Sequence, residues 1–218
     1  FINDTQLLWR DEAQIERDEH RGDADRPRTR DQQPQAVGRE IVSLSSRPNS
    51  LADVVFQDEI VAQFRGIRDT GEMPHMLLHG PPGTGKTSII LALARDVFGA
   101  EFGHRVLELN ASDDRGIGKV REKVKKYAET KLAKLPPGKP NYKIIVLDEA
   151  DQMTPDAQHA LRRVIEDYAS ITRFCLICNY VTKIIEPLAS RCIKFRFKEI
   201  PLEYQITQLA SIAKTEGM

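Results

Sequence analysis

The sequence predicts an α/β fold, in which a parallel five-stranded sheet is flanked by helices. Three observations support this expectation. Short apolar runs alternate along the chain with longer segments whose apolar residues recur at helical spacing. The run at 143–147 is apolar from Ile144 onward, as expected of a strand buried on both faces of a parallel sheet. A glycine-rich loop also connects one expected strand directly to a helix, as in many such sheets.

The first half of the fold contains two helices around a short strand. Ile60, Val61 and Phe64 share one side of the first helix, at 58–70, and Gly71 ends it. The strand at 76–78 precedes the glycine-rich loop, and the second helix follows at 88–98. A strand at 105–110 comes next.

The second half continues the alternation. A helix at 119–135 is broken by prolines and a glycine at 136–138, and the buried strand at 143–147 follows. Thr154 and Pro155 are typical of an N-cap and a first helical position. Further elements are strands at 173–179 and 192–197 and a helix at 204–214.

Composition limits the kind of protein. Lysine plus arginine and aspartate plus glutamate number 32 each, so no overall charge indicates a nucleic-acid partner. We find no signal peptide and no run able to span a bilayer, and we expect a soluble intracellular protein without a membrane partner. Three cysteines suit a reducing compartment. Cys175 and Cys178 should point to opposite faces of a strand, which favours core packing over a metal pair.

Residues 1–46 differ from the remainder. The charged stretch at 11–35 is nearly free of aliphatic residues, and we expect a disordered arm at 1–46. An ordered domain is expected at 47–200, and 201–218 would begin a second, helical domain. Because the sequence begins at Phe1 and ends within an expected helix, we expect a fragment.

The loop at 80–88 carries the clearest chemical signal. Its spacing fits G-x-x-x-x-G-K-[ST], between a strand and a helix, which predicts a phosphate-binding loop. Backbone amides would point at phosphate oxygens, Lys86 would reach the β- and γ-phosphates, and Thr87 would hold Mg²⁺. The residues expected to contact ATP here are Gly80, Pro81, Pro82, Gly83, Thr84, Gly85, Lys86, Thr87 and Ser88.

Two acids end the strand at 143–147. Ligands bind at the carboxyl ends of such strands, so Asp148 and Glu149 should lie beside the phosphates. Asp148 fits the Mg²⁺ site together with Thr87, and Glu149 fits a base that polarises the attacking water. Residues 148–151 also spell a helicase signature, which we interpret as coincidental.

Three further features keep two interpretations each. Asn179 either orients water near the γ-phosphate or caps a strand. Arg191 is either a surface charge or an arginine finger that acts on a neighbouring subunit. The basic helix around 119–126 is either a solvated face or a surface for the phosphates of a nucleic acid.

With these segments in view, residues 47 to about 214 resemble the small subunits of replication factor C, the eukaryotic sliding-clamp loader of the AAA+ class, and especially those numbered second or fourth. The boxes that carry the resemblance are GPPGTGKT (80–87), NASDDRGI (110–117), VLDEAD (146–151), RFCLICNYVTKIIEPLASRC (173–192) and KFRFK (194–198). The first and third occur widely among ATPases, and the others are more particular to clamp loaders.

The resemblance implies several roles. Asn179 matches the sensor 1 position, and Arg191 matches the arginine of the SRC motif, which reaches the ATP of the adjacent subunit. The remaining implied contacts are Arg47, Val55 and Gln57 toward the nucleotide, and Arg115, Lys119, Arg121 and Lys125 toward the duplex backbone.

The chain also departs from the family. Residues 42–46 replace most of the box that ends in Arg-Pro. Phe56 stands at a glycine position, where a side chain would crowd the adenine or need another backbone angle. The match ends near the start of the lid, so the family's sensor 2 arginine and helical collar lie beyond it.

The resemblance implies an ATPase in a hetero-pentamer of replication factor C subunits. It would use ATP and Mg²⁺ to load a PCNA-type ring onto primer-template DNA, in the nucleus, during replication and repair. Two alternatives remain, namely a nucleotide-binding or regulatory module without turnover and another AAA+ DNA machine.

Overall fold

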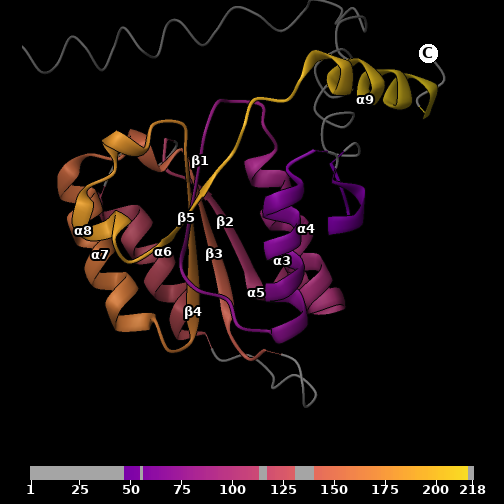
Figure 1. Ribbon diagram of the computed structural model, residues 1–218. Coiled ribbons are helices and arrows are strands. Elements are labelled where there is room, and N and C mark those ends of the chain that lie inside the picture. The colour runs from indigo at the N-terminus through magenta and orange to yellow at the C-terminus, as the bar shows by residue number, and fades with distance from the viewer. Residues whose placement is uncertain (1–46, 55, 113–116, 131–139, 216–218) are drawn as a thin grey trace, which may run out of the picture. The chain divides into compact units, whose positions relative to one another are not determined.

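Five parallel strands form the centre of the fold, in the order β2-β3-β4-β1-β5 (Figure 1). The computed structural model describes residues 47–54, 56–112, 117–130 and 140–215, all within the unit 45–218. The predicted arm at 1–46 lies outside the described residues. The strands are β1 Met76–His79, β2 Val106–Asn110, β3 Lys143–Asp148, β4 Thr172–Cys178 and β5 Ile193–Arg196. The predicted α/β fold with a parallel five-stranded sheet is confirmed.

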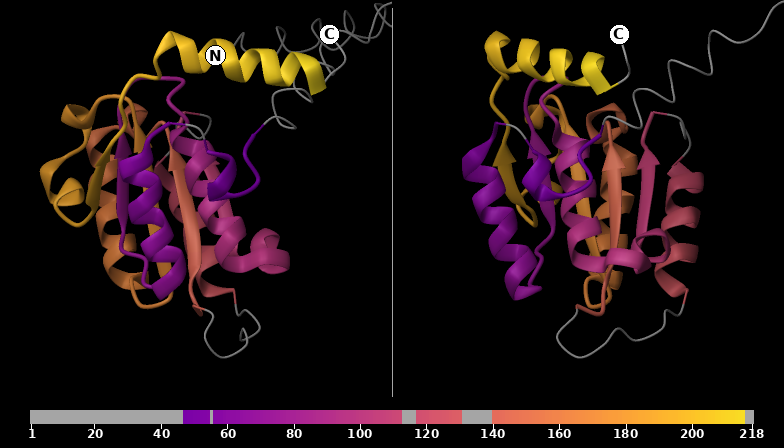
Figure 2. Two further views of the ribbon diagram at one scale, coloured as in Figure 1. Left: turned by 45° about the vertical axis from the view of Figure 1, so that its right-hand side comes forward. Right: turned by 90° about the vertical axis from the view of Figure 1, so that its right-hand side faces the viewer.

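Helices cover both faces of this sheet (Figures 1 and 2). One face carries α3 (Asp58–Thr70), α4 (Lys86–Phe98) and the short α5 (Phe102–Arg105), and the other carries α6 (Ile117–Glu129), α7 (Pro155–Tyr168) and α8 (Glu186–Ala189). Single 3₁₀ turns occur at η1 (Leu51–Asp53), η2 (Gly99–Glu101), η3 (Ala150–Gln152) and η4 (Val181–Lys183). Helix α9 (Leu202–Thr215) lies across the end of the sheet where the strands finish.

One apolar core lies on each face of the sheet, because strand side chains alternate between the two faces. In β4, Cys175 and Ile177 pack into the core under α3 and α4. Leu176 and Cys178 pack into the core under α6, α7 and α8. The two cysteines of the C-x-x-C pattern therefore point to opposite faces, as the spacing predicts.

Local sequence accounts for the end of α3 and the start of α7. Helix α3 buries Ile60, Val61 and Phe64 and ends at Gly71, whose φ is 71° and whose amide donates to the carbonyl of Ile67. Helix α7 begins after Thr154, whose hydroxyl accepts a hydrogen bond from the amide of Ala157. Both helices begin where the sequence predicts.

Several expected boundaries are wrong by a few residues. Strand β2 begins at Val106 and not at 105, because Arg105 ends the unpredicted α5. Helix α6 begins at Ile117 and ends at Glu129, before the 131–139 segment that lies outside the described residues. Asn179 follows β4 and is not part of it. Within the described ranges, none of the helices is both long and apolar enough to traverse a bilayer.

Candidate functional site

The loop after β1 has a backbone that only glycine fits well at two positions. Gly80 has a φ of 147°, and a Cβ there would lie 2.5 Å from the carbonyl oxygen of Phe197. Gly85 has a φ of 85° and forms the N-cap of α4 without any side-chain cap. The first amides of α4 are therefore not capped by a side chain at the N-cap, and this end of the helix favours an anion.

Lys86 lies at the bottom of this loop. Its ammonium donates to the carbonyls of Gly80 and Pro81, at 2.8 and 2.7 Å, and to Asn179 Oδ1, at 3.0 Å. Burial lowers the pKa of Lys86, and the nearby carboxylate of Asp148 partly opposes this. The residue predicted to bind phosphate and the residue predicted to sense it are thus in direct contact.

Thr87 and Asp148 also meet at this point. The Thr87 hydroxyl donates to Asp148 Oδ2 at 2.6 Å, although the residues belong to α4 and β3. A hydroxyl and a carboxylate held together are oxygen ligands of the kind that Mg²⁺ takes. The two residues predicted to hold the metal therefore fit that group.

A second acid, Asp151, organises the neighbouring turn. It is buried, and its Oδ2 accepts from the amides of Asn179 and Tyr180 at 3.3 and 3.1 Å. We did not predict this role, although Asp151 ends the VLDEAD box. Glu149 has a φ of 53°, and its amide donates to Asp148 Oδ1. Its role as a base remains a prediction.

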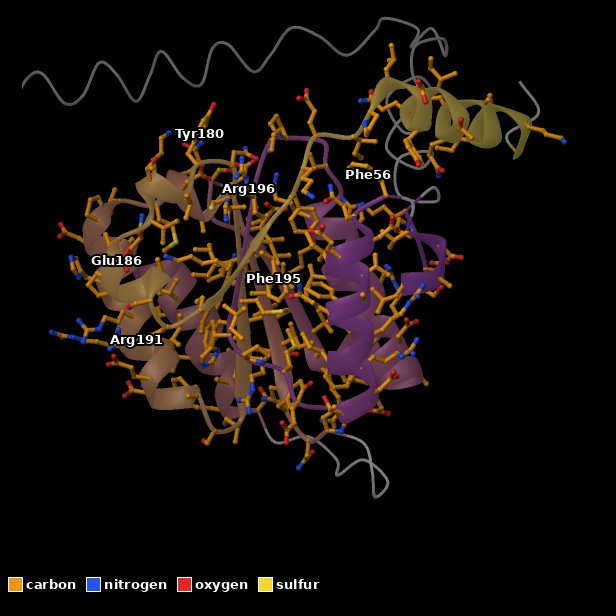
Figure 3. All side chains as sticks on the ribbon, viewed as in Figure 1. Phe56, Tyr180, Glu186, Arg191, Phe195 and Arg196 are labelled. Atoms are coloured by element: carbon orange, nitrogen blue, oxygen red, sulfur yellow. The ribbon has the colours of Figure 1, made fainter. Side chains whose placement is uncertain are left out.

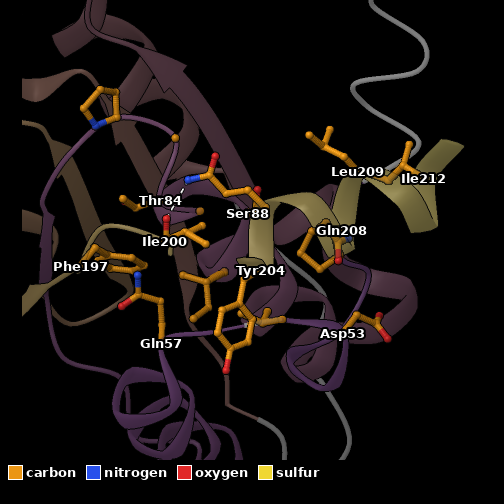
Figure 4. Close-up of a pocket in the computed structure, with 17 residues that line it drawn as sticks. Asp53, Gln57, Thr84, Ser88, Phe197, Ile200, Tyr204, Gln208, Leu209 and Ile212 are labelled. Carbon is orange, nitrogen blue, oxygen red and sulfur yellow. Dashed lines mark hydrogen bonds between the residues drawn. The ribbon is translucent and has the colours of Figure 1, made fainter. Parts of the chain in front are cut away.

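A pocket of about 450 Å³ extends from the loop toward α9 (Figure 4). Six of the predicted ATP contacts line it, namely Gln57, Pro82, Gly83, Thr84, Gly85 and Ser88. The residues that we did not predict include Pro48, Asp53, Val54, Ile89, Phe197, Ile200, Tyr204, Gln205, Gln208, Leu209 and Ile212. Its volume is within the usual range for small-molecule sites, about 300–1,000 Å³.

Outside the loop, the residues that the resemblance places toward the nucleotide either have contacts within the protein or are not described. The Gln57 amide group bonds both backbone groups of Lys198, donating to the carbonyl at 2.7 Å and accepting from the amide at 3.3 Å. Arg47 does not line the pocket and lies 3.9 Å from the Glu108 carboxylate. Val55 lies outside the described residues. Phe56 keeps a glycine-like backbone angle, with a φ of 67°, and does not move to another one as one of the two expectations had it.

Arg191 lies far from this pocket. Figure 3 shows it beside α7 and α8, on the side opposite Phe56 and α9. Its guanidinium is 2.5 Å from Glu166 Oε1 and also donates to the carbonyl of Pro187. This arrangement does not bring Arg191 to the chain's own phosphate loop, and an action on another subunit remains a prediction.

The structure describes little of the predicted nucleic-acid surface. Arg115 lies outside the described residues, and the side chains of Lys119 and Arg121 are not described. Lys125 is exposed on α6, 3.9 Å from Glu129. Both interpretations of this helix stay open.

Three comparisons with known proteins agree with the geometry. Residues 76–200 match the model of the ATPase family associated with various cellular activities (AAA). The chain is 52% identical over 181 residues to "Replication factor C subunit 2" of Saccharomyces cerevisiae, and 54% identical over 176 residues to "Replication factor C subunit 4" of Homo sapiens. The predicted resemblance to these subunits is confirmed.

The chain is much shorter than the relatives it matches. Each alignment includes 79% of this chain but only 51% and 48% of the two relatives, so the chain spans about half of their length. A solved structure of a Thermotoga maritima RuvB mutant has a TM-score of 0.59 at 19% identity, and covers 80% of this chain and 56% of that one. At this identity the likeness shows the fold alone.

Proposed function

We propose, because the chain belongs to the AAA ATPase family and resembles replication factor C small subunits, that it binds and hydrolyses ATP as part of a sliding-clamp loader. One observation carries the proposal. Lys86 contacts Asn179 at 3.0 Å while the next residue, Thr87, contacts Asp148 at 2.6 Å. Groups suited to phosphate, metal and water thus converge at adjacent strand ends.

The proposed roles follow from these positions. Lys86 exchanges its carbonyl contacts for β- and γ-phosphate oxygens, and the α4 amides bind the same anion. Thr87 and Asp148 hold Mg²⁺, which would neutralise charge between the phosphates. Glu149 takes a proton from the attacking water, and Asn179, held by Asp151, orients that water.

The remaining roles belong to an assembly. We propose that Arg191 stabilises the charge of phosphoryl transfer in a neighbouring subunit, and that ATP closes the subunits around primer-template DNA to load a PCNA-type ring. Arg115, Lys119, Arg121 and Lys125 would contact DNA phosphates without sequence preference. The assembly would act in the nucleus, and α9 would begin the lid domain at 201–218.

The test is ATP turnover in a replication factor C assembly reconstituted with this chain in place of a small subunit. We expect turnover to rise when primed DNA and the clamp are both added. The Lys86→Ala chain should lose nucleotide binding, measured by titration with a fluorescent ATP analogue. Binding of ATP without incorporation or turnover would instead favour a nucleotide-binding module. Strand unwinding would favour another AAA+ machine.

A further inference from the structure

Phe56 holds a backbone conformation that side chains rarely adopt. Its φ is 67°, and the next residue, Gln57, has a φ of 74°. A Cβ in this left-handed region meets the following carbonyl, so surrounding contacts must compensate the strain. For Gln57, the paired hydrogen bonds to Lys198 are such contacts.

For Phe56, the compensating contact is with α9. Its ring lies 5.5 Å from the ring of Tyr204, at an interplanar angle of 48°. In the part of α9 that the structure describes, side-chain hydrogen bonds are local, from Gln205 to Ile200 and from Thr207 to Glu203. The aromatic pair therefore connects α9 to a segment nearly 150 residues earlier in the chain.

The same helix forms a wall of the pocket. Its lining residues are Tyr204, Gln205, Gln208, Leu209 and Ile212, which recur at helical spacing. Figure 4 shows four of them, Tyr204, Gln208, Leu209 and Ile212, on α9 at the edge of the pocket. Tyr204 and Leu209 nevertheless remain 45% and 65% exposed. Because these side chains bury little surface, the position of α9 over the pocket depends on its contacts with the rest of the unit, such as the ring pair of Phe56 and Tyr204.

We propose that Phe56 is a positioning residue for nucleotide binding, which holds α9 over the pocket through Tyr204. Loss of either ring would free the helix to move away, and ATP would dissociate faster. The proposal rests on the proposed function, because it takes ATP as the ligand. It adds a coupling between the nucleotide and α9 that passes through one pair of rings.

The test measures dissociation of a fluorescent ATP analogue, N-methylanthraniloyl-ATP, chased with unlabelled ATP. Phe56→Leu keeps a side chain on the strained backbone and removes only the ring, and Tyr204→Leu removes the other ring at a half-exposed position. We expect each to raise the dissociation rate about three- to tenfold, the effect of one aromatic contact. Because both act through one contact, the double variant should be no faster than either single variant.

Further variants separate positioning from loss of structure. Tyr204→Phe keeps the ring and should give a dissociation rate within about twofold of that of the unmodified chain. Ile206 is exposed on α9 outside the pocket, so Ile206→Ala should leave the rate unchanged. ATP should slow amide exchange across 202–215 in the unmodified chain but not in Phe56→Leu or Tyr204→Leu.

Two results would overturn the proposal while leaving ATP binding intact. They are unchanged dissociation in both single variants, or single effects that multiply in the double variant. If the unmodified chain binds the analogue no better than Lys86→Ala does, the proposed function itself fails, and this inference fails with it.

Discussion

Thr87 and Asp148 show how much of the site depends on single atoms. They are 61 positions apart, yet the hydroxyl of one donates to the carboxylate of the other at 2.6 Å. The contact leaves Asp148 Oδ1 to accept from the amide of Glu149. The fold thus provides a hydrogen-bond donor to each carboxylate oxygen of Asp148, and the metal role proposed for Thr87 depends on its single hydroxyl oxygen.

Thr87→Val should weaken ATP binding only when Mg²⁺ is present. Valine keeps the shape of threonine and removes the hydroxyl oxygen. We expect at least about a tenfold loss of affinity with Mg²⁺, the size of one polar contact to a charged group, and a change within about twofold in EDTA. Titration with a fluorescent ATP analogue measures both. Thr87→Ser should behave as the unmodified chain, and an equal loss in EDTA would contradict a metal role.

His75 gives a prediction for pH. Its Nδ1 accepts from the amide of Phe174 at 3.1 Å, so that nitrogen carries no proton in the folded chain. Burial lowers the pKa of His75, and the nearby Arg173 lowers it further. The unfolded chain therefore takes up the proton first, and the free energy of unfolding should fall as pH drops below about 6.5.

Urea unfolding at pH 7.5 and 5.5 checks this expectation. The unmodified chain should lose more stability between the two values than His75→Asn, whose amide oxygen can accept the same bond without titrating. Removing the ring contact with Phe174 lowers the stability of this variant at both pH values, so the difference between pH values is the quantity to compare. Equal differences would rule out His75 as the cause.

At the scale of elements, periodicity and caps could predict what is local. The sequence predicts helix α3 at 58–70 and the helix lies at Asp58–Thr70, because an apolar stripe and a terminal glycine both define it. The residues from Gly99 to Arg105 could not be assigned in this way. Their helix is one turn long, and the buried Arg105 that ends it bonds Asn141 and the carbonyl of Tyr142, about 36 residues later.

In the candidate site, too, residues within one segment could be predicted, and residues that depend on contacts between distant segments could not. The loop motif lies within one continuous segment, so spacing alone could predict Lys86 and Thr87. The buried Asp151 and the α9 wall depend on contacts between distant segments, for which the sequence contains no periodic signal. Phe56 lies between these cases, because the sequence shows that a side chain replaces a glycine there but predicts neither the glycine-like angle that Phe56 keeps nor its contact with Tyr204.

The start of α7 offers a test of element stability. Thr154 accepts from the amide of Ala157 at 3.3 Å, and Pro155 occupies the first turn. Thr154→Ala should lower the free energy of unfolding by about 1 kcal/mol, the usual cost of a lost N-cap. Thr154→Ser keeps the acceptor oxygen and should cost clearly less in the same urea titration. Equal losses would mean that packing of the threonine methyl group, and not the cap, stabilises the start of α7.

At the scale of the whole described unit, the two predicted catalytic regions lie on opposite sides. The phosphate loop and α9 occupy one side, and Arg191 lies beside α7 and α8 on the other (Figure 3). Glu166 forms an ion pair with the Arg191 guanidinium. Hydrogen bonds from Arg162 and Arg191 lower the pKa of the Glu166 carboxyl. Exposed ion pairs of this kind cost little to break, as the role proposed for Arg191 in a neighbouring subunit requires.

Arg191→Ala should therefore separate a chain's own site from that of its neighbour. In a reconstituted assembly we expect the ATP affinity of this chain to stay within about twofold, because Arg191 lies away from its pocket. Turnover at the adjoining site should fall at least about a hundredfold, since an arginine finger supplies charge only in the transition state. Arg68→Ala, which removes an exposed arginine from the α3 side, is the matched control and should change neither quantity. Loss of affinity at the chain's own site would show that Arg191 acts within one chain. The phosphate loop and Arg191 would then serve the same ATP site and not the sites of two neighbouring subunits.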